Sequence, residues 1–132
     1  MVNEAILRTR LADPIDFTVA DGTGIEKGAL LKLTDPRTAI LSDGSGDVIA
    51  GIAARDKIAS DGRTQLAVFR KGIFDMVASG AITTGAKVVS GLTGSLNFVS
   101  AAGDAADSGA VIIGHALEDA ANTETAQIWV NL

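Results

Sequence analysis

The sequence contains no cysteine and no tyrosine, and among its 132 residues it has one histidine and one tryptophan. Without cysteine there are no disulfides, no thiolate zinc site and no cysteine nucleophile, and a single histidine leaves no second imidazole for a metal site. No apolar stretch approaches the roughly 18 residues that a membrane-spanning helix needs. The opening stretch MVNEAILRTRLADPID lacks the apolar core of a signal peptide. We therefore expect a soluble protein that is synthesised in a cytoplasm and has no membrane partner.

Positive charge is also scarce. Eleven lysines and arginines stand against sixteen aspartates and glutamates, and the formal net charge is −5. A general nucleic-acid binder needs cations that neutralise phosphates, so we expect no nucleic-acid partner. The length of the chain suits one domain whose core needs no disulfide or metal to hold it together.

Small and β-branched residues are plentiful, and they form short runs between turn-forming residues. The strand-like runs are residues 29–33, 48–53, 65–70, 86–90, 110–116 and 126–131. Such runs, separated by clusters such as SDGSGD (42–47), are typical of an all-β sandwich or barrel. Segments 53–60 and 116–121 are too short for regular helices and are expected to form short helical turns. Gly72 is expected to interrupt a strand within VFRKGIFDM (68–76).

The chain also carries an internal repeat. The matched segments are VADGTGIEKGALLKL (19–33) with VASGAITTGAKVVS (77–90), IAGIAARD (49–56) with IIGHALED (112–119), and TQLAVFR (64–70) with AQIWVNL (126–132). Their order is the same in both halves, which indicates an internal duplication. We therefore predict a mainly β fold, a small barrel or sandwich, with one domain over residues 19–132 that consists of pseudo-repeats of about 19–74 and 77–132.

The stretch DGTGIEKGA (21–29) has glycines spaced almost as in a nucleotide-binding loop. A dinucleotide fingerprint needs a helix after the glycines, and a P-loop needs Gly-Lys followed by Ser or Thr. Here a strand-like run follows, and the lysine precedes the glycine. Glycine allows a positive φ in a tight turn, and the second copy keeps glycines at the ends of the stretch. The predicted structural turns are at Gly22, Gly28, Gly80 and Gly85.

The remaining chemical candidates are weak. Asp43 and Asp47 alternate like the first ligands of a calcium loop, but Ala54 stands where that loop needs its later glutamate. A hairpin connection is favoured there, and ion binding by these two aspartates stays open. His115 lies in an apolar run and is interpreted as a structural histidine, and Trp129 as a residue of the core or of an interface. We find no catalytic constellation, so we expect no enzyme, no cofactor and no metal site.

The N-terminal segment, residues 1–18, has no counterpart in the second copy. If it is extended, Arg8 and Arg10 point to one side and the residues between them to the other. One interpretation is an extended N-terminal arm that becomes ordered on a partner, and the other is a frayed terminus or an extra edge strand. The candidate contact residues of this arm are Ile6, Leu7, Arg8, Arg10 and Leu11.

The stretch SGDVIAGIAARD, followed by TQLAVFRKGIF, resembles the capsid decoration, or cement, proteins of tailed bacteriophages, including the lambda-type head-stabilising proteins. The residues that carry the resemblance are Gly51, Ile52, Thr64, Leu66, Phe69, Lys71, Gly72 and Phe74. The resemblance implies a tulip-like β-barrel on the exterior of the capsid in the virion. It also implies that the protein binds the major capsid protein, as a homotrimer at three-fold or quasi-three-fold sites, and clamps neighbouring subunits against internal DNA pressure.

From this resemblance we expect the segment from Ile6 to Leu11 to pair with a sheet edge of the capsid protein. Affinity spread over several capsid subunits would need no chemistry. Two other interpretations stay open. One is a small β-barrel module that binds a ligand or carbohydrate, and the other is a different structural component of a virion, such as a tail or head fibre.

Overall fold

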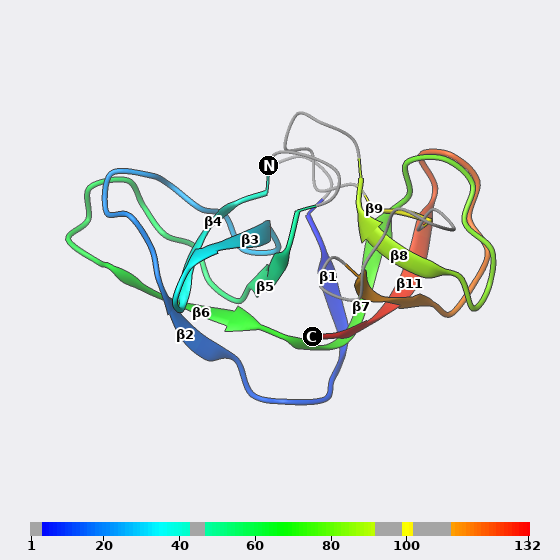
Figure 1. Cartoon of the computed structure of the whole chain (residues 1–132), viewed down its shortest axis with the longest axis horizontal. Coiled ribbons are helices and arrows are strands. Elements are labelled where there is room, and N and C mark those ends of the chain that lie inside the picture. The colour runs from blue at the N-terminus through cyan, green and yellow to red at the C-terminus, as the bar shows by residue number, and fades with distance from the viewer. Residues whose placement is uncertain (1–3, 43–46, 92–98, 102–111) are drawn as a thin grey trace.

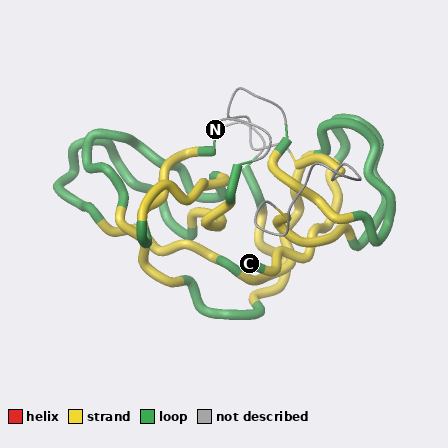
Figure 2. The backbone as a smooth tube through the Cα atoms, in the orientation of Figure 1, coloured by secondary structure: helices red, strands yellow, loops and turns green. Residues whose placement is uncertain are grey.

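Two β lobes make up the part of the chain that the computed structural model describes, which is residues 4–42, 47–91, 99–101 and 112–132. These residues contain eleven strands and no helix, so the expected mainly β fold is confirmed, whereas helical turns at 53–60 and 116–121 are not formed. Both segments instead form bends. An isolated bridge joins each of them to an earlier loop, such as the bridge between Ile25 and Lys57. Figures 1 and 2 show the two lobes beside each other.

Lobe 1 is a closed barrel. Its strands are β2 (Ile15–Thr18), β3 (Leu30–Asp35), β4 (Thr38–Leu41), β5 (Ile49–Ala53) and β6 (Gln65–Phe69). The order is β2-β4-β3-β5-β6, and β6 pairs back onto β2. Phe17, Leu31 and Val68 belong to the buried cluster of this barrel. Because neighbouring residues of a strand point to opposite faces, Leu30 and Phe69 lie on the outside of the barrel.

Lobe 2 is a six-stranded sheet. Its strands are β1 (Ile6–Arg10), β7 (Lys71–Val77), β8 (Lys87–Ser90), β9 (Val99–Ala101), β10 (Ile112–Ala116) and β11 (Thr125–Asn131). The order is β1-β7-β11-β10-β8-β9. A parallel bridge between Ala78 and Val99 joins the end of β7 to β9, as the parallel pair of Thr18 and Thr38 joins β2 to β4 in lobe 1.

The two lobes repeat the same hydrogen bonds at matching turns. The backbone N–H of Gly28 donates to the carbonyl of Ala53 at 2.9 Å, and that of Gly85 donates to the carbonyl of Ala116 at 2.8 Å. An aspartate then accepts from the backbone one residue earlier in each copy, at 2.6 Å from Lys27 to Asp56 and at 2.7 Å from Thr84 to Asp119. The hydrogen bond from the backbone N–H of Thr84 is the main reason that the pKa of Asp119 is lowered.

The predicted turn glycines differ in conformation. Gly28, Gly80 and Gly85 have φ values of +87°, +84° and +85°. Gly22 lies in a turn without a positive φ, and a Cβ there would meet nothing within 4 Å. Three of the four glycines therefore hold a backbone conformation that an L side chain disfavours.

A second pair of glycines allows two strands to approach closely in each lobe. A Cβ on Gly51 would lie 2.3 Å from the carbonyl oxygen of Phe69, and a Cβ on Gly114 would lie 1.8 Å from that of Trp129. Both glycines lie beside a shift in strand register. Phe69 and Trp129 therefore occupy the same position in the two lobes.

This equivalence corrects the sequence alignment of the last segment. Ala53 pairs with Val68 in lobe 1, and Ala116 pairs with Ile128 in lobe 2. Val68 thus corresponds to Ile128, two positions earlier than the aligned segments 64–70 and 126–132 place it. The cause is the connection before the last strand, which is shorter in the second copy and which a comparison of small, similar residues did not resolve.

The N-terminal segment is part of both lobes, so an arm that ends at residue 18 is not what the fold forms. β1 pairs with β7, and β2 closes the barrel of lobe 1, where Phe17 is buried. Figure 1 shows β1 between the lobes. Ala5, Leu7 and Phe17 of this segment therefore pack within the chain. The backbones of β1 and β2 pair with strands whose hydrogen-bonding edges would otherwise be open.

The strand break expected at Gly72 lies at Arg70 instead. Arg70 separates β6 from β7, so the chain passes from lobe 1 to lobe 2 at this residue. Gly72 is inside β7 and buried, and a Cβ there would lie 2.9 Å from the ring of Phe74 and 3.1 Å from the carbonyl oxygen of Thr9. Glycine at this position leaves space for β1 beside β7, which is a packing role rather than a turn.

A buried lysine holds the outer loops of lobe 1 together. The ammonium of Lys57 is fully buried and donates to the carbonyls of Asp21 at 2.8 Å and Ile58 at 3.1 Å, and to Asp61 Oδ1 at 3.1 Å. The backbone N–H of Arg63 is the main cause that lowers the pKa of Asp61, and the Lys57 ammonium lowers it further. In lobe 2 the equivalent bridge is made by an alanine.

We predict that Gly114→Ala destabilises the protein, because the new Cβ would overlap the carbonyl oxygen of Trp129. The free energy of unfolding should fall by about 3 kcal/mol, the upper range for overpacking. Gly22→Ala is the matched control and should change it by less than about 0.5 kcal/mol. Urea unfolding monitored by circular dichroism measures both, and equal stabilities of the two variants would show that β10 and β11 are not in this close contact.

We also predict that Lys57→Met destabilises lobe 1, because it leaves two carbonyls and the Asp61 carboxylate without their shared donor. Removing one partner from a buried charge network costs about 3 kcal/mol. Lys27→Met, at an exposed lysine, should cost less than about 0.5 kcal/mol. The measurement is the midpoint of thermal unfolding, and a Lys57→Met midpoint equal to that of the control would contradict the assigned role of the ammonium.

Candidate interaction surface

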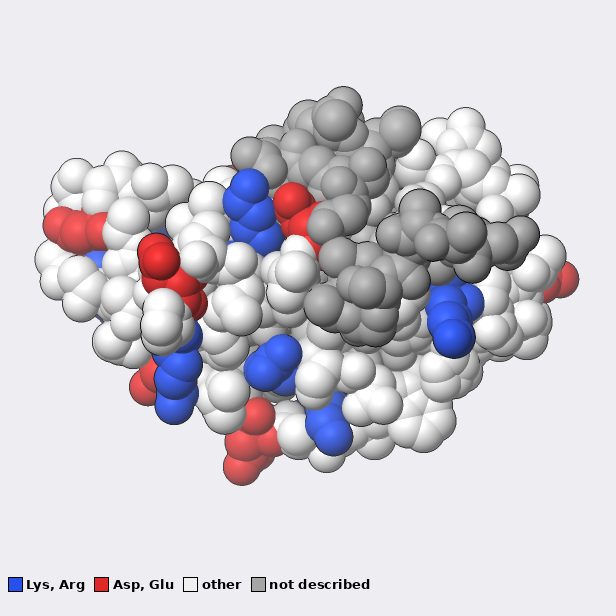
Figure 3. All heavy atoms as spheres, in the orientation of Figure 1, with Lys and Arg blue, Asp and Glu red and all other residues white. Residues whose placement is uncertain are grey.

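The surface of the described residues holds no clear centre of chemistry. Within residues 4–42, 47–91, 99–101 and 112–132, no three His, Asp or Glu side chains gather as a metal site requires. The same residues include no helix long and apolar enough to cross a membrane. On the face drawn in Figure 3, basic and acidic side chains are interspersed among the coloured residues, and neither sign forms a continuous patch.

The candidate calcium loop is only partly described. Asp43 lies outside the described residues. Asp47 accepts a hydrogen bond from the hydroxyl of Ser42 at 2.8 Å, and that hydroxyl lies 3.1 Å from the hydroxyl of Ser90. Asp47 therefore contributes to a polar contact that reaches from lobe 1 to lobe 2.

β1 is the end strand of the six-stranded sheet, and a bulge changes which way its side chains point. Ile6 lies opposite Asp75, Leu7 opposite Phe74 and Thr9 opposite Ile73, with a register shift at Arg8. Residues opposite each other share a face, so Leu7 faces the core, where it packs against the buried cluster. The extra residue of a bulge interrupts alternation. Arg8 and Arg10 consequently do not form the one-sided pair expected from an extended strand.

Each arginine of β1 has its own contact. Arg8 Nε donates to Asp75 Oδ2 at 2.5 Å, an ion pair on the outer face of the sheet. Arg10 donates to Asp13 Oδ1 at 2.8 Å, and its guanidinium carbon lies 5.8 Å from the centre of the Phe69 ring. Ile6 and Leu11 remain exposed at 54% and 46%. Of the five predicted contact residues, these two present apolar side chains to solvent.

A groove lies where β1 meets lobe 1. Its volume is about 560 Å³, and its lining consists of Glu4, Ala5, Ile6, Leu7, Lys27, Ala54 and Phe69. Ala5 donates its backbone N–H to the carbonyl of Gly28 at 2.9 Å, which closes one end of the contact between β1 and lobe 1. The groove therefore combines an end strand, an exposed isoleucine and an aromatic floor. Sheets commonly add a strand from another protein at such an edge.

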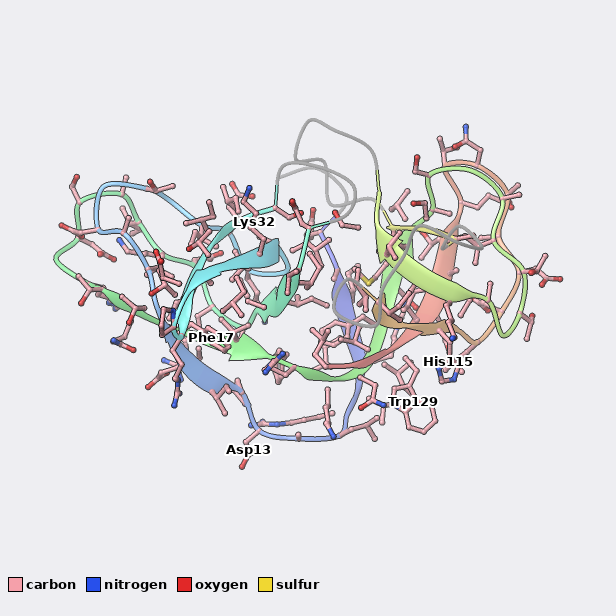
Figure 4. All side chains as sticks on the ribbon, viewed as in Figure 1. Asp13, Phe17, Lys32, His115 and Trp129 are labelled. Carbon is pink, nitrogen blue, oxygen red and sulfur yellow. The ribbon has the colours of Figure 1, made fainter. Side chains whose placement is uncertain are left out.

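A second surface lies on the outer face of lobe 2. Trp129 is 40% exposed, and its ring centre is 5.6 Å from that of His115. Figure 4 shows both rings projecting away from the sheet. His115 is therefore half-buried on a solvent-facing surface rather than inside the apolar core. The sequence signal for this exposed face was the alternation along β11. Ile128 and Val130 are fully buried on one face of the strand, so Trp129 between them points to the other face.

Comparison with known proteins places the chain among phage proteins. Residues 10–132 match the model of a family described as phage cement protein. The head fibre gp8.5 N base of bacteriophage phi29 has a similar structure, with a TM-score of 0.57 and 15% sequence identity over 89% of this chain and 93% of that chain. At this identity the similarity concerns the fold alone. No curated protein sequence matches.

The resemblance carried by residues from Gly51 to Phe74 is confirmed by a family match that extends well beyond them. The barrel expected from that resemblance is present as lobe 1. The family match supports a structural protein of the bacteriophage virion. Since the matched region spans residues 10–132, the chain belongs to the phage cement protein family.

Proposed function

We propose that the protein binds the outer surface of a phage head and clamps neighbouring major capsid subunits, so that the capsid withstands internal DNA pressure. The observation that carries the proposal is the groove at the end strand β1, with exposed Ile6 beside it. A strand of the capsid protein entering this groove would pair with β1 and bury Ile6. The protein itself would catalyse no reaction and need no cofactor.

This proposal changes the role of the N-terminal segment. Leu7 packs against the buried cluster and Arg10 lies near Phe69, so the exposed apolar contacts of the segment would come from Ile6 and Leu11. The segment would act as the receiving edge of a folded sheet instead of a free arm that becomes ordered on the capsid. A folded edge loses less conformational entropy on binding than a disordered arm does.

A clamp needs contacts with several subunits at once. We propose a homotrimer at three-fold or quasi-three-fold positions, in which each copy contributes one groove. Linked contacts of this kind raise the overall affinity far above that of a single contact. The trimer would place the protein on the exterior of the capsid, where the junctions between capsomers are accessible.

A fibre component is the second candidate. It is favoured by the similarity of the fold to the base of a head fibre. Electron microscopy of heads mixed with the protein separates the two functions. Compact density at the junctions of capsomers supports a clamp, whereas density that continues outward as a stalk supports a fibre base.

We predict that Ile6→Lys weakens binding to expanded heads by about tenfold or more, because a lysine cannot replace an apolar anchor at the edge of the groove. Ile6 is more than half exposed, so the fold should remain, as thermal unfolding will verify. Ile58→Lys makes the same change at a 73% exposed site outside the groove, and should bind like the unsubstituted protein. Cosedimentation with heads gives the affinities. Unchanged binding by Ile6→Lys, or equal weakening by both variants, would refute the role of the groove.

A further inference from the structure

Lobe 1 packs against lobe 2 through one of its outer faces, and lobe 2 has an equivalent face that the described chain leaves exposed. We infer that a second copy of this chain covers this face of lobe 2. The inference names a surface for the association between copies that the proposed function includes, but it is drawn from the repeat and does not depend on binding to the head. It concerns the outer face of β8, β10 and β11, centred on Trp129.

The covered surface in lobe 1 is a row of three apolar side chains. Leu30 lies opposite Ile52, and Ile52 lies opposite Phe69, so the row crosses β3, β5 and β6 on one face. All three are buried, with exposures of 1%, 1% and 8%. They share one buried cluster with residues of lobe 2, and the ring of Phe69 meets that of Phe74 edge to face at 5.8 Å. This row is therefore part of the apolar contact between the lobes.

The same row exists in lobe 2, where no part of the described chain covers it. Lys87 lies opposite His115, and His115 lies opposite Trp129, across β8, β10 and β11. The 40% exposure of Trp129 contrasts with the buried state of its counterpart Phe69. Lysine and histidine in place of leucine and isoleucine make this face tolerable in water. An exposed tryptophan is the kind of residue that anchors the centre of a separable interface.

The glycine turns give an independent sign of the same asymmetry. Gly28 and Gly85 have nearly the same φ and the same backbone hydrogen bond. A Cβ on Gly28 would lie 2.6 Å from the carbonyl oxygen of Ala5, because the N-terminal segment lies on that turn. A Cβ on Gly85 would meet nothing within 4 Å. The turn beside the row is thus covered in lobe 1 and open in lobe 2.

The partner surface follows from the repeat as well. Phe74, which covers Phe69, lies opposite Ile128 on β7, and the residue at the same place in lobe 1 is Ile15, opposite Val68 on β2. Ile15 is 42% exposed. A second copy that repeats the contact between the lobes would therefore place its Ile15 against Trp129.

The surroundings of Ile15 suit this contact. Arg37 and Arg70 lie over the ring of Phe17, each at 5.9 Å, on the face of β2 that carries Ile15. Guanidinium groups also bind the face of an indole. The two surfaces are different, so the association is head to tail, and it forms a ring if the rotation closes.

Cysteine cross-linking tests this contact directly, because the chain has no cysteine of its own. Ile15→Cys and Trp129→Cys variants are prepared separately, one with an affinity tag so that the mixed dimer differs in mass, then mixed at high concentration and oxidised. A disulfide forms only if the two Cβ atoms approach to about 4 Å. We expect the mixed dimer to exceed both same-variant dimers.

The control replaces Ile15→Cys with Ile58→Cys, which is more exposed and lies outside the inferred contact. Its mixed dimer with Trp129→Cys should stay at the level of random collisions. A yield equal to that of the Ile15→Cys pair would overturn the inference. So would a Trp129→Cys variant that cross-links to capsid protein on heads but not to Ile15→Cys. Because head binding is measured separately with Ile6→Lys, failure here leaves the proposed binding to the head standing.

Discussion

The contact of Phe69 with Phe74 is the interaction on which the rest of the structure depends. Each lobe alone would approach the size, about 60 residues, at which a single core is only marginally stable. The outer row of lobe 1 and the interior of lobe 2 instead form one buried cluster, which extends from Leu30 to Val130. This cluster also contains Ala5, so the N-terminal segment is held in place by the same contact, and with it the groove.

The two lobes share a backbone design but differ in what surrounds it. Their glycine turns, aspartate contacts and register shifts agree, whereas the side chains on their outer faces do not. Lobe 1 uses Lys57 to fasten its loops where lobe 2 has Ala120. Lobe 1 buries its outer row and lobe 2 leaves it open. A duplicated framework can therefore keep its strands while each copy acquires a different surface, which would suit the proposed contacts with several neighbours in a virion.

Much of the fold could be predicted because the strand-like runs at 29–33, 48–53 and 65–70 are mainly apolar and are separated by clusters of turn-forming residues. The N-terminal segment was less predictable, because an exposed isoleucine and two arginines suit a free arm as well as an edge strand. β7 was obscured by Gly72, whose role in admitting β1 depends on a strand more than sixty residues distant. The groove could not be predicted at all, since its lining combines residues 4–7 with Lys27, Ala54 and Phe69 of lobe 1, which are far apart in the sequence.

By itself, the sequence determined the local features: the period of the strands, the positive φ at the glycine turns, the absence of thiol chemistry and the resemblance to the family. These depend on neighbours along the chain. Only the tertiary structure decided which outer face is covered. Phe69 and Trp129 occupy equivalent positions in similar strands, and alternation along each strand places both on an outer face without deciding whether that face is covered. Burial depends on which surface packs against that face, and only the arrangement of the two lobes supplies one for Phe69.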